Sequence, residues 1–172
     1  MRKIAIAASL LAGCVALPAL ADDFNIPARK PGQWKVEMIP ETAGAAPKMT
    51  FQLCLDAASD KALMQMGSAM AGGSCQTNPP TESGGTYTFD ATCDFGKMKT
   101  KSHTEISGDF QSAYSMKITS DVTSGAGPMP KHSVMTQNAT WVGECSGGLA
   151  PGDMLMSNGM KVNPLKLMKP AG

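Results

Sequence analysis

Methionine side chains are the first residues of this chain whose type and spacing could do chemistry. Met64 and Met66 stand two residues apart, and a similar spacing recurs near the C-terminus at Met154, Met156 and Met160. Thioethers are soft ligands that select Cu(I), so these residues are candidate ligands of a copper-binding protein. Methionine is also a flexible filler of irregular cores. Because only 5% of the residues are aromatic, we expect packing to be the main role of methionine here, and copper binding is the alternative.

Catalysis by an imidazole would have to use His103 or His132, the two histidines of the chain. The alternation of residue types places His103 on the polar face of a strand and His132 where a loop meets a strand. The sequence contains no Gly-x-Ser-x-Gly elbow. The glycine-rich run 143–148 lacks the Lys and Ser or Thr of a phosphate-binding loop. The sequence therefore predicts a protein that is not an enzyme and that carries no cofactor.

Four cysteines, Cys54, Cys75, Cys93 and Cys145, follow the N-terminal region. No two of them have the spacing of a thiol-exchange motif or a zinc site. Paired cysteines are typical of proteins in oxidising compartments, and four cysteines allow three pairings. Cys75 and Cys93 are symmetric about Gly84 in a predicted hairpin, where they would face each other. This symmetry favours a Cys75–Cys93 disulfide and leaves Cys54–Cys145 as the second.

The N-terminus has the pattern of an export signal. Positive residues in 1–3 precede an apolar run at 4–11, which is too short to span a membrane, and small residues precede Ala21. We expect cleavage after Ala21, a signal peptide at 1–21 and a periplasmic or secreted protein. The alternative is a lipoprotein anchored through Cys14, because residues 11–14 also match a lipidation box.

The composition fits one domain over residues 22–172. The formal net charge is +1, so there is no basic excess to attract nucleic acid. No segment after the leader is apolar enough to span a membrane. The 18 glycines and 12 prolines predict many turns. The composition does not identify a ligand or partner.

Alternating apolar and polar residues predict six or seven strands. A short helix is expected over 57–66, with Asp56 as its cap and Gly67 near its end. The strands show no alternation with long helices, which favours antiparallel pairing. We predict a mainly β fold: a curved antiparallel sheet or partly open barrel with one short helix, stapled by two disulfides. The predicted strands lie at 34–38, 49–53, 75–93 as a hairpin, 97–106, 110–118, 134–142, and 154–162 as a second hairpin.

The apolar face of such a sheet could pack against itself or hold an apolar small molecule or partner segment, as small barrels do. We therefore predict a non-enzymatic exported domain that binds an apolar ligand or a component of the cell envelope. The candidate ligand-binding residues are the large apolar side chains of this face: Trp34, Phe51, Phe89, Tyr114, Met116 and Trp141.

A basic stripe is formed by Lys97, Lys99 and Lys101, which alternate with other residues along one predicted strand. Such a stripe could dock anionic headgroups or acidic polymers of the envelope. The alternative is a solvated strand face whose charges discourage aggregation.

Several short motifs resemble those of a known family when taken in order. The residues concerned are Pro-Gly-Gln-Trp-Lys-Val at 31–36, Cys54, Cys75, Cys93, Trp-Val-Gly-Glu-Cys at 141–145, Pro-Gly-Asp-Met at 151–154 and Asn-Gly-Met-Lys-Val-Asn at 158–163. Together they resemble the bacterial exported domains of domain-of-unknown-function family 3617, which open with a similar Pro-Gly-Leu-Trp-Glu-Val motif. The resemblance implies an exported β domain with paired cysteines. It implies no chemistry, because the family has no established activity. The lipidation-box-like leader and the basic strand at 97–101 depart from the pattern.

Overall fold

The structure is a computed structural model that describes residues 26–42, 46–71, 75–125 and 130–167. The predicted leader, with Ala21 and Cys14, lies outside the described residues. The elements are β1 Gly32–Pro40, β2 Met49–Leu55, α1 Ala57–Ala71, β3 Cys75–Thr77, β4 Thr81–Ser83, β5 Thr86–Asp94, β6 Lys99–Gly108, β7 Ala113–Ser124, β8 His132–Gly143, β9 Met154–Met156, β10 Lys161–Val162 and α2 Pro164–Leu167.

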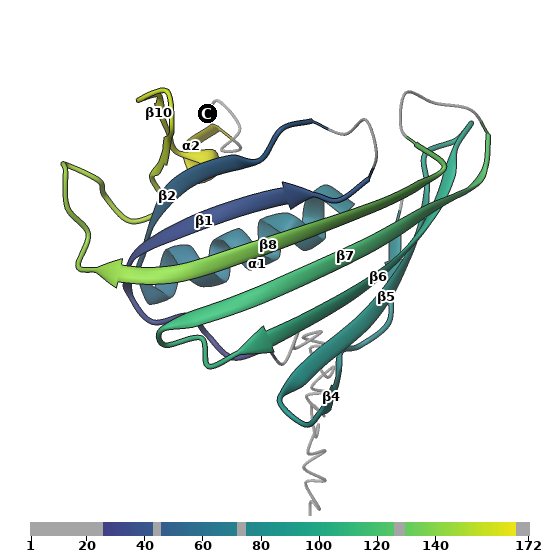
Figure 1. The fold of residues 1–172 in the computed structure, drawn as a ribbon, viewed down its shortest axis with the longest axis horizontal. Helices are drawn as coiled ribbons and strands as arrows, with labels where there is room; N and C mark the ends of the chain where they lie inside the picture. The colour runs from purple at the N-terminus through teal and green to yellow at the C-terminus, as the bar shows by residue number, and fades with distance from the viewer. Residues whose placement is uncertain (1–25, 43–45, 72–74, 126–129, 168–172) are drawn as a thin grey trace, which may run out of the picture.

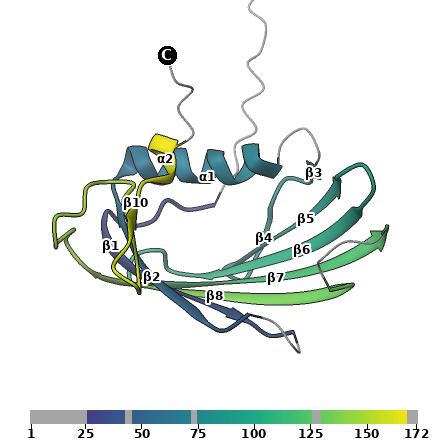
Figure 2. The same cartoon turned by 90° about the horizontal axis from the view of Figure 1, so that it is seen from above.

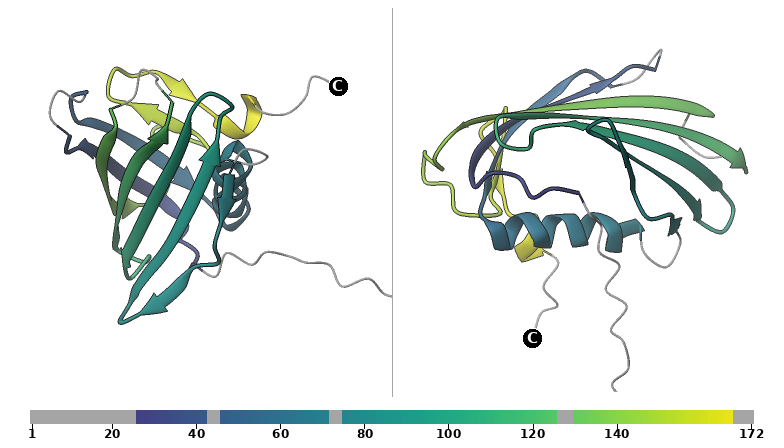
Figure 3. Two further views of the ribbon diagram at one scale, coloured as in Figure 1. Left: turned by 90° about the vertical axis from the view of Figure 1, so that its right-hand side faces the viewer. Right: turned by 90° about the horizontal axis from the view of Figure 1, so that it is seen from below.

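All the strands belong to one antiparallel sheet (Figure 1). Its order is β10-β9-β2-β1-β8-β7-β6-β5-β3, and β4 pairs with β5 beside β3. Strands β5 to β8 follow one another as hairpins, whereas β1 pairs with the distant β8 and so joins the two ends of the chain. The sheet is curved, and α1 lies across its concave side (Figures 2 and 3). The predicted curved antiparallel sheet is confirmed.

The period of two in each strand decides which side chains face the core. In β1, Trp34 and Val36 are buried while Lys35 between them is exposed. The same alternation in β6 buries Thr104 and Ile106 and leaves Lys101 at the surface. Burial of the apolar side chains on the concave face is the main force that stabilises the curved sheet. The core cluster consists of Trp34, Val36, Phe51, Leu53, Leu55, Ile106, Phe110, Tyr114 and Ala139.

Both predicted disulfides are present, Cys54–Cys145 and Cys75–Cys93. Cys75 and Cys93 are direct partners in the β3–β5 pairing, as the hairpin symmetry predicts. In the sequence, Cys54 lies shortly before α1 and Cys75 lies shortly after α1. The two disulfides therefore flank α1 in the sequence. Each one links the segment at one end of the helix to another part of the sheet.

Several local expectations differ from the structure: a second helix, α2, follows β10, and the strand predicted from residue 110 begins at Ala113. The helix continues past Gly67 to Ala71, because one glycine costs only about 1 kcal/mol relative to alanine and does not end a helix by itself. The sheet has ten strands rather than six or seven, since the first predicted hairpin is divided into β3, β4 and β5 and the second into β9 and β10. The predicted strand from residue 97 begins at Lys99, because Phe95 donates from its backbone to the Met98 carbonyl and closes a turn.

Candidate functional site

A cavity of about 430 Å³ lies between α1, the arm formed by residues 26–31 and the concave face of the sheet. Such a volume is within the range of small-molecule sites, which are also mostly apolar with a few polar groups. Most of the lining here is apolar too. The lining residues are Ile26, Pro27, Ala28, Arg29, Ala57, Asp60, Lys61, Met64, Ile106, Phe110, Tyr114, Met116 and Gln137.

One face of α1 forms the roof of the cavity. Ala57, Asp60, Lys61 and Met64 line it, and their spacing of three, four and seven residues places them on one side of a helix. Asp56 caps this helix, because its carboxylate accepts a hydrogen bond of 2.7 Å from the Ser59 backbone. The cap fixes where the helix begins and hence which of its residues face the cavity.

Arg29 joins the roof to the floor of the cavity. Its Nε donates to Asp60 Oδ1 on α1 at 2.6 Å, and its Nη1 donates to the Tyr114 hydroxyl on β7 at 3.1 Å. Gln137 on β8 donates to the same hydroxyl at 3.1 Å. Burial alone would lower the pKa of Arg29, but its interactions with Tyr114 and Asp60 raise that pKa overall. The guanidinium therefore stays protonated and forms a close ion pair with Asp60 at one end of the cavity.

Phe110 closes the end of the cavity at the β6–β7 turn. Its φ is 57°, a left-handed conformation that costs a non-glycine residue about 1–2 kcal/mol. The Phe110 ring is buried, stacks on Tyr114 at 5.7 Å and meets Tyr87 edge-on at 6.0 Å. Its carbonyl accepts a hydrogen bond of 2.8 Å from the Lys30 backbone. The strained turn thus places a core ring and also holds the arm.

Asp109 stabilises the same turn from outside. Its carboxylate accepts hydrogen bonds from the Ser112 hydroxyl and from the backbone of Gln111, Ser112 and Ala113. These bonds, the Ser112 side chain first, hold the pKa of Asp109 far below its usual value. The charged carboxylate therefore accepts hydrogen bonds from backbone N–H groups that would otherwise have no partner in this tight turn.

The six predicted ligand-binding residues all belong to or pack against the core cluster, but only two of them line the cavity. Tyr114 and Met116 line the cavity. Trp34 and Phe51 belong to the buried core, and Phe89 is half-buried and packs against it. These three side chains fill space between the sheet and its neighbours rather than line the cavity.

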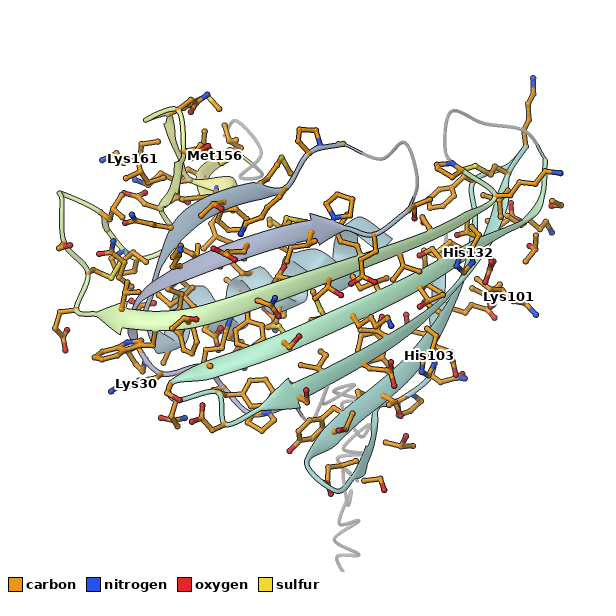
Figure 4. All side chains as sticks on the ribbon, viewed as in Figure 1. Lys30, Lys101, His103, His132, Met156 and Lys161 are labelled. Carbon is orange, nitrogen blue, oxygen red and sulfur yellow. A yellow bond between two sulfur atoms is a disulfide. The ribbon has the colours of Figure 1, made fainter. Side chains whose placement is uncertain are left out.

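Trp141 is the sixth of these residues, and it also lies away from the lining. Its Nε1 donates to the Pro31 carbonyl at 3.0 Å, and the Lys30 ammonium stands 3.6 Å from its ring centroid. Figure 4 places Lys30 at the opposite end of the sheet from Lys101 and the two histidines. Trp141 therefore anchors the arm through a cation–π contact and a hydrogen bond.

The arm and the polar residues of the cavity give no distinct signal in the sequence. Residues 26–31, with Pro27 and Pro31, have no periodicity and read as a loose segment. Asp60 reads as an acid in the first turn of a helix, which the helix dipole alone would explain. Gln137 stands among polar strand residues. Only the pairing of β1 with β8 and the docking of the arm bring these side chains together.

The candidate copper ligands stand on separate elements. Met64 is at the rim of the cavity and Met66 is half-buried, both on α1. Met154 and Met156 on β9 pack against the core, and Met160 is 53% exposed in the turn that follows. Core filling accounts for Met154 and Met156. Over residues 26–42, 46–71, 75–125 and 130–167, no group of three or more His, Cys, Asp or Glu is placed to hold a metal ion.

Both histidines lie in exposed cross-strand pairs. His103 Nδ1 is 2.7 Å from Asp90 Oδ1, and His132 Nδ1 is 2.8 Å from Asp121 Oδ1. They lie at the same end of the sheet as Lys101 (Figure 4). Exposed pairs of this kind contribute little to stability.

The predicted basic stripe is interrupted by acidic partners. Lys97 lies in the turn before β6, and Lys99 pairs with Asp94 at 3.0 Å. Lys101 stands opposite Asp121 in the β6–β7 register. Opposite charges facing each other across strands stabilise a sheet, so this arrangement fits a solvated strand face.

The fold and the site define a class: a single curved antiparallel sheet with one helix across its concave side and an apolar cavity beneath the helix. The family described as "protein of unknown function (DUF3617)" matches residues 29–145. The match covers more than half of the 172 residues, and the chain belongs to this family, as its motifs predict. No curated protein and no solved structure matches the chain. Neither helix of the described part is long and apolar enough to cross a bilayer.

Proposed function

We propose that this chain is an exported, non-enzymatic binding protein that holds an apolar small molecule in the cavity beneath α1. The observation that carries the proposal is the cavity itself, which has a volume of about 430 Å³, is partly open to solvent, and is bordered by a helix, an arm and a curved sheet. Ile106, Met116 and Phe110 present apolar surface to this space. Releasing water from such surface into bulk favours the binding of an apolar molecule.

The walls of the cavity are held in place before any ligand arrives. Arg29 connects the arm to α1 and to β7, and the two disulfides tie both ends of α1 to the sheet. A pre-formed site avoids much of the ordering entropy that binding otherwise costs. This pre-organisation favours ligand binding over a role in which the concave face is only a packing surface.

A dye-binding experiment tests the proposal. The uncharged dye N-phenylnaphthylamine, which brightens in apolar surroundings, is titrated into the disulfide-bonded protein. We expect saturable binding that Met64→Trp weakens about tenfold or more, because the larger ring fills space at the rim of the cavity. Met49→Trp is the matched control, because Met49 and Met64 are 45% and 38% exposed and only Met64 lines the cavity.

Equal binding by Met64→Trp and Met49→Trp would locate the dye elsewhere and overturn the assignment of this cavity. Circular dichroism of both variants controls for folding. A saturable signal that disappears in Met64→Trp alone supports the proposal.

Export rests on the leader pattern and on the two disulfides, which persist in oxidising compartments. Intact-mass measurement of the protein from its native cells tests it. We expect residues 1–21 to be absent and four cysteines to be paired. Acyl chains on Cys14 would instead show an anchored lipoprotein, and an uncut chain with free thiols would refute export.

A further inference from the structure

The polar end of the cavity has unused hydrogen-bond donors. Both carboxylate oxygens of Asp60 accept from Arg29, Oδ1 from Nε at 2.6 Å and Oδ2 from the backbone amide at 3.1 Å. The Nη2 group of Arg29 has no acceptor among the described residues. No buried side-chain nitrogen or oxygen in the described part lacks a partner, so this Nη2 is accessible to solvent. Because Arg29 lines the cavity, Nη2 can donate to a molecule inside it.

The Tyr114 hydroxyl is a second donor. Its oxygen accepts from Arg29 Nη1 and from Gln137 Nε2, both at 3.1 Å. A hydroxyl oxygen has two lone pairs and one hydrogen. Because both lone pairs are engaged, the hydrogen is left to donate, and no acceptor for it lies among the described residues. Tyr114 also lines the cavity, and its hydroxyl is 3.1 Å from Nη1, the other terminal nitrogen of the Arg29 guanidinium.

The charge at this end is positive. Arg29 and Asp60 neutralise each other, whereas Lys61, which lines the cavity from α1, has no ion pair within the described ranges. Desolvation alone would lower the pKa of Arg29, but Tyr114 and Asp60 raise its pKa overall, so it keeps its charge. A cationic headgroup would be repelled by Lys61, whereas an anionic one would gain a charge-assisted contact with it.

The remaining lining sets the length of the ligand. The apolar side of the cavity is formed by Ile26, Ala28, Met64, Ile106 and Met116. The volume of about 430 Å³ corresponds to roughly fourteen groups of the size of water, each with about 30 Å³ in the liquid. A methylene group is of similar size, so a chain of roughly twelve carbons together with the two oxygens of its carboxylate is comparable to this space.

From this combination we infer that the ligand is a single-chain carboxylic acid, with its carboxylate held by Arg29 Nη2, the Tyr114 hydroxyl and Lys61. The alkyl chain lies along Ile106 and Met116 beneath α1. Both oxygens of a carboxylate can then receive charge-assisted hydrogen bonds, which are the strong ones. The inference rests on the proposed function, since it names the class of molecule that the same cavity takes.

The test compares headgroups on one chain length. Dodecanoate, dodecanol and dodecylamine are titrated by calorimetry into the disulfide-bonded protein, each below the concentration at which it forms micelles. We expect dodecanoate to bind about tenfold more tightly than dodecanol, as a hydrogen bond to a charged group allows. Dodecylamine should bind most weakly, because Lys61 repels its ammonium and Arg29 already occupies both oxygens of Asp60.

Two variants separate the headgroup contacts from folding. Tyr114→Phe removes one hydroxyl and Lys61→Gln removes one exposed charge. Each should lower the affinity for dodecanoate about five- to tenfold and leave the affinity for dodecanol unchanged within about twofold. Lys99→Gln is the matched control for charge, because Lys99 is an exposed lysine on β6 that does not line the cavity. It should leave all three titrations unchanged.

The outcomes distinguish the two proposals. If dodecanol binds as tightly as dodecanoate and Tyr114→Phe changes neither, the carboxylate assignment is wrong and the apolar-ligand function stands. If none of the three probes binds and the neutral dye does not bind either, the function fails as well. Preferential binding of dodecanoate that both variants reduce supports the inference.

Discussion

The Arg29 guanidinium donates to the Asp60 carboxylate at 2.6 Å, and this ion pair joins the N-terminal arm to the first turn of α1. The Arg29 and Asp60 side chains are 13% and 6% exposed. Arg29 also reaches Tyr114 on the opposite wall. Three segments far apart in sequence therefore meet at one side chain, and the shape of the cavity depends on it.

Removing one partner of this pair should cost much more than removing an exposed one. Asp60→Asn leaves a buried guanidinium without its counter-ion, so we expect a loss of about 3 kcal/mol in the free energy of unfolding, measured with urea. The matched control is Asp121→Asn, whose exposed partner is His132. Its expected loss is below about 1 kcal/mol.

Replacing both partners together checks the reason for this loss. Arg29→Met combined with Asp60→Leu buries no charge, so the double variant should recover most of the stability that Asp60→Asn loses. Equal losses for Asp60→Asn and Asp121→Asn would show that the arm does not depend on this ion pair.

The Asp109 carboxylate predicts a pH dependence of stability. Hydrogen bonds from Ser112 and the turn backbone lower its folded pKa far below the ordinary value of 3.8. A carboxylate with a depressed folded pKa adds stability above its unfolded pKa and loses that stability as the pH falls toward the folded value. Asp109→Asn should therefore lower the melting temperature at pH 7, and the difference from wild type should shrink below about pH 4.

Ser112→Ala serves as the partial version of this experiment, because it removes the side-chain donor and keeps the backbone donors. The melting temperature of this variant should lie between those of wild type and Asp109→Asn at pH 7. A wild-type advantage over Asp109→Asn that stays constant down to pH 2 would contradict the role of the charge.

The features that follow from local pattern could be predicted from the sequence. The alternation of apolar and polar residues in β6 and β7 predicts both the strands and the faces that point to the core, because alternate side chains of a strand lie on the same face. The Cys75–Cys93 pair follows from the symmetry of a hairpin about Gly84, and the second pair follows by elimination. The family motifs depend on the same short segments.

The cavity could not be predicted in the same way, because it is made by non-local contacts. Nothing in the sequence near Arg29 indicates that it meets Asp60 and Tyr114, which lie 31 and 85 residues further along the chain. The sequence predicts that large apolar residues form the site, but Trp34 and Phe51 are buried in the core. Which large side chains fill the core and which border open space is decided by tertiary packing, and side-chain size alone does not indicate it.

The two disulfides should contribute unequally and act on opposite ends of α1. Their sequence separations are 91 for Cys54–Cys145 and 18 for Cys75–Cys93. Loop-closure entropy predicts losses of about 4–5 and about 3 kcal/mol when each pair is replaced by serines. Urea unfolding measures these losses. Hydrogen exchange should accelerate near Ala57 in the first variant and near the C-terminal end of α1 in the second.

Equal exchange along α1 in both serine variants would show that the disulfides do not hold the ends of the helix separately. A smaller loss for Cys54–Cys145 than for Cys75–Cys93 would contradict the loop-length argument. Reduction of wild type by dithiothreitol gives a control without substitution, and it should lower stability at least as much as the costlier variant.

The left-handed backbone of Phe110 predicts a reversal of the usual order of glycine and alanine. Phe110→Ala loses the stacked ring and keeps the strain at φ 57°, for a cost of about 3–5 kcal/mol. Phe110→Gly loses the same ring but adopts positive φ without strain, so it should be more stable than Phe110→Ala by about 1 kcal/mol. Urea unfolding of the two variants measures the difference. If alanine proves more stable, the turn relaxes to an ordinary conformation once the ring is absent, and burial of the ring is what holds the strained backbone.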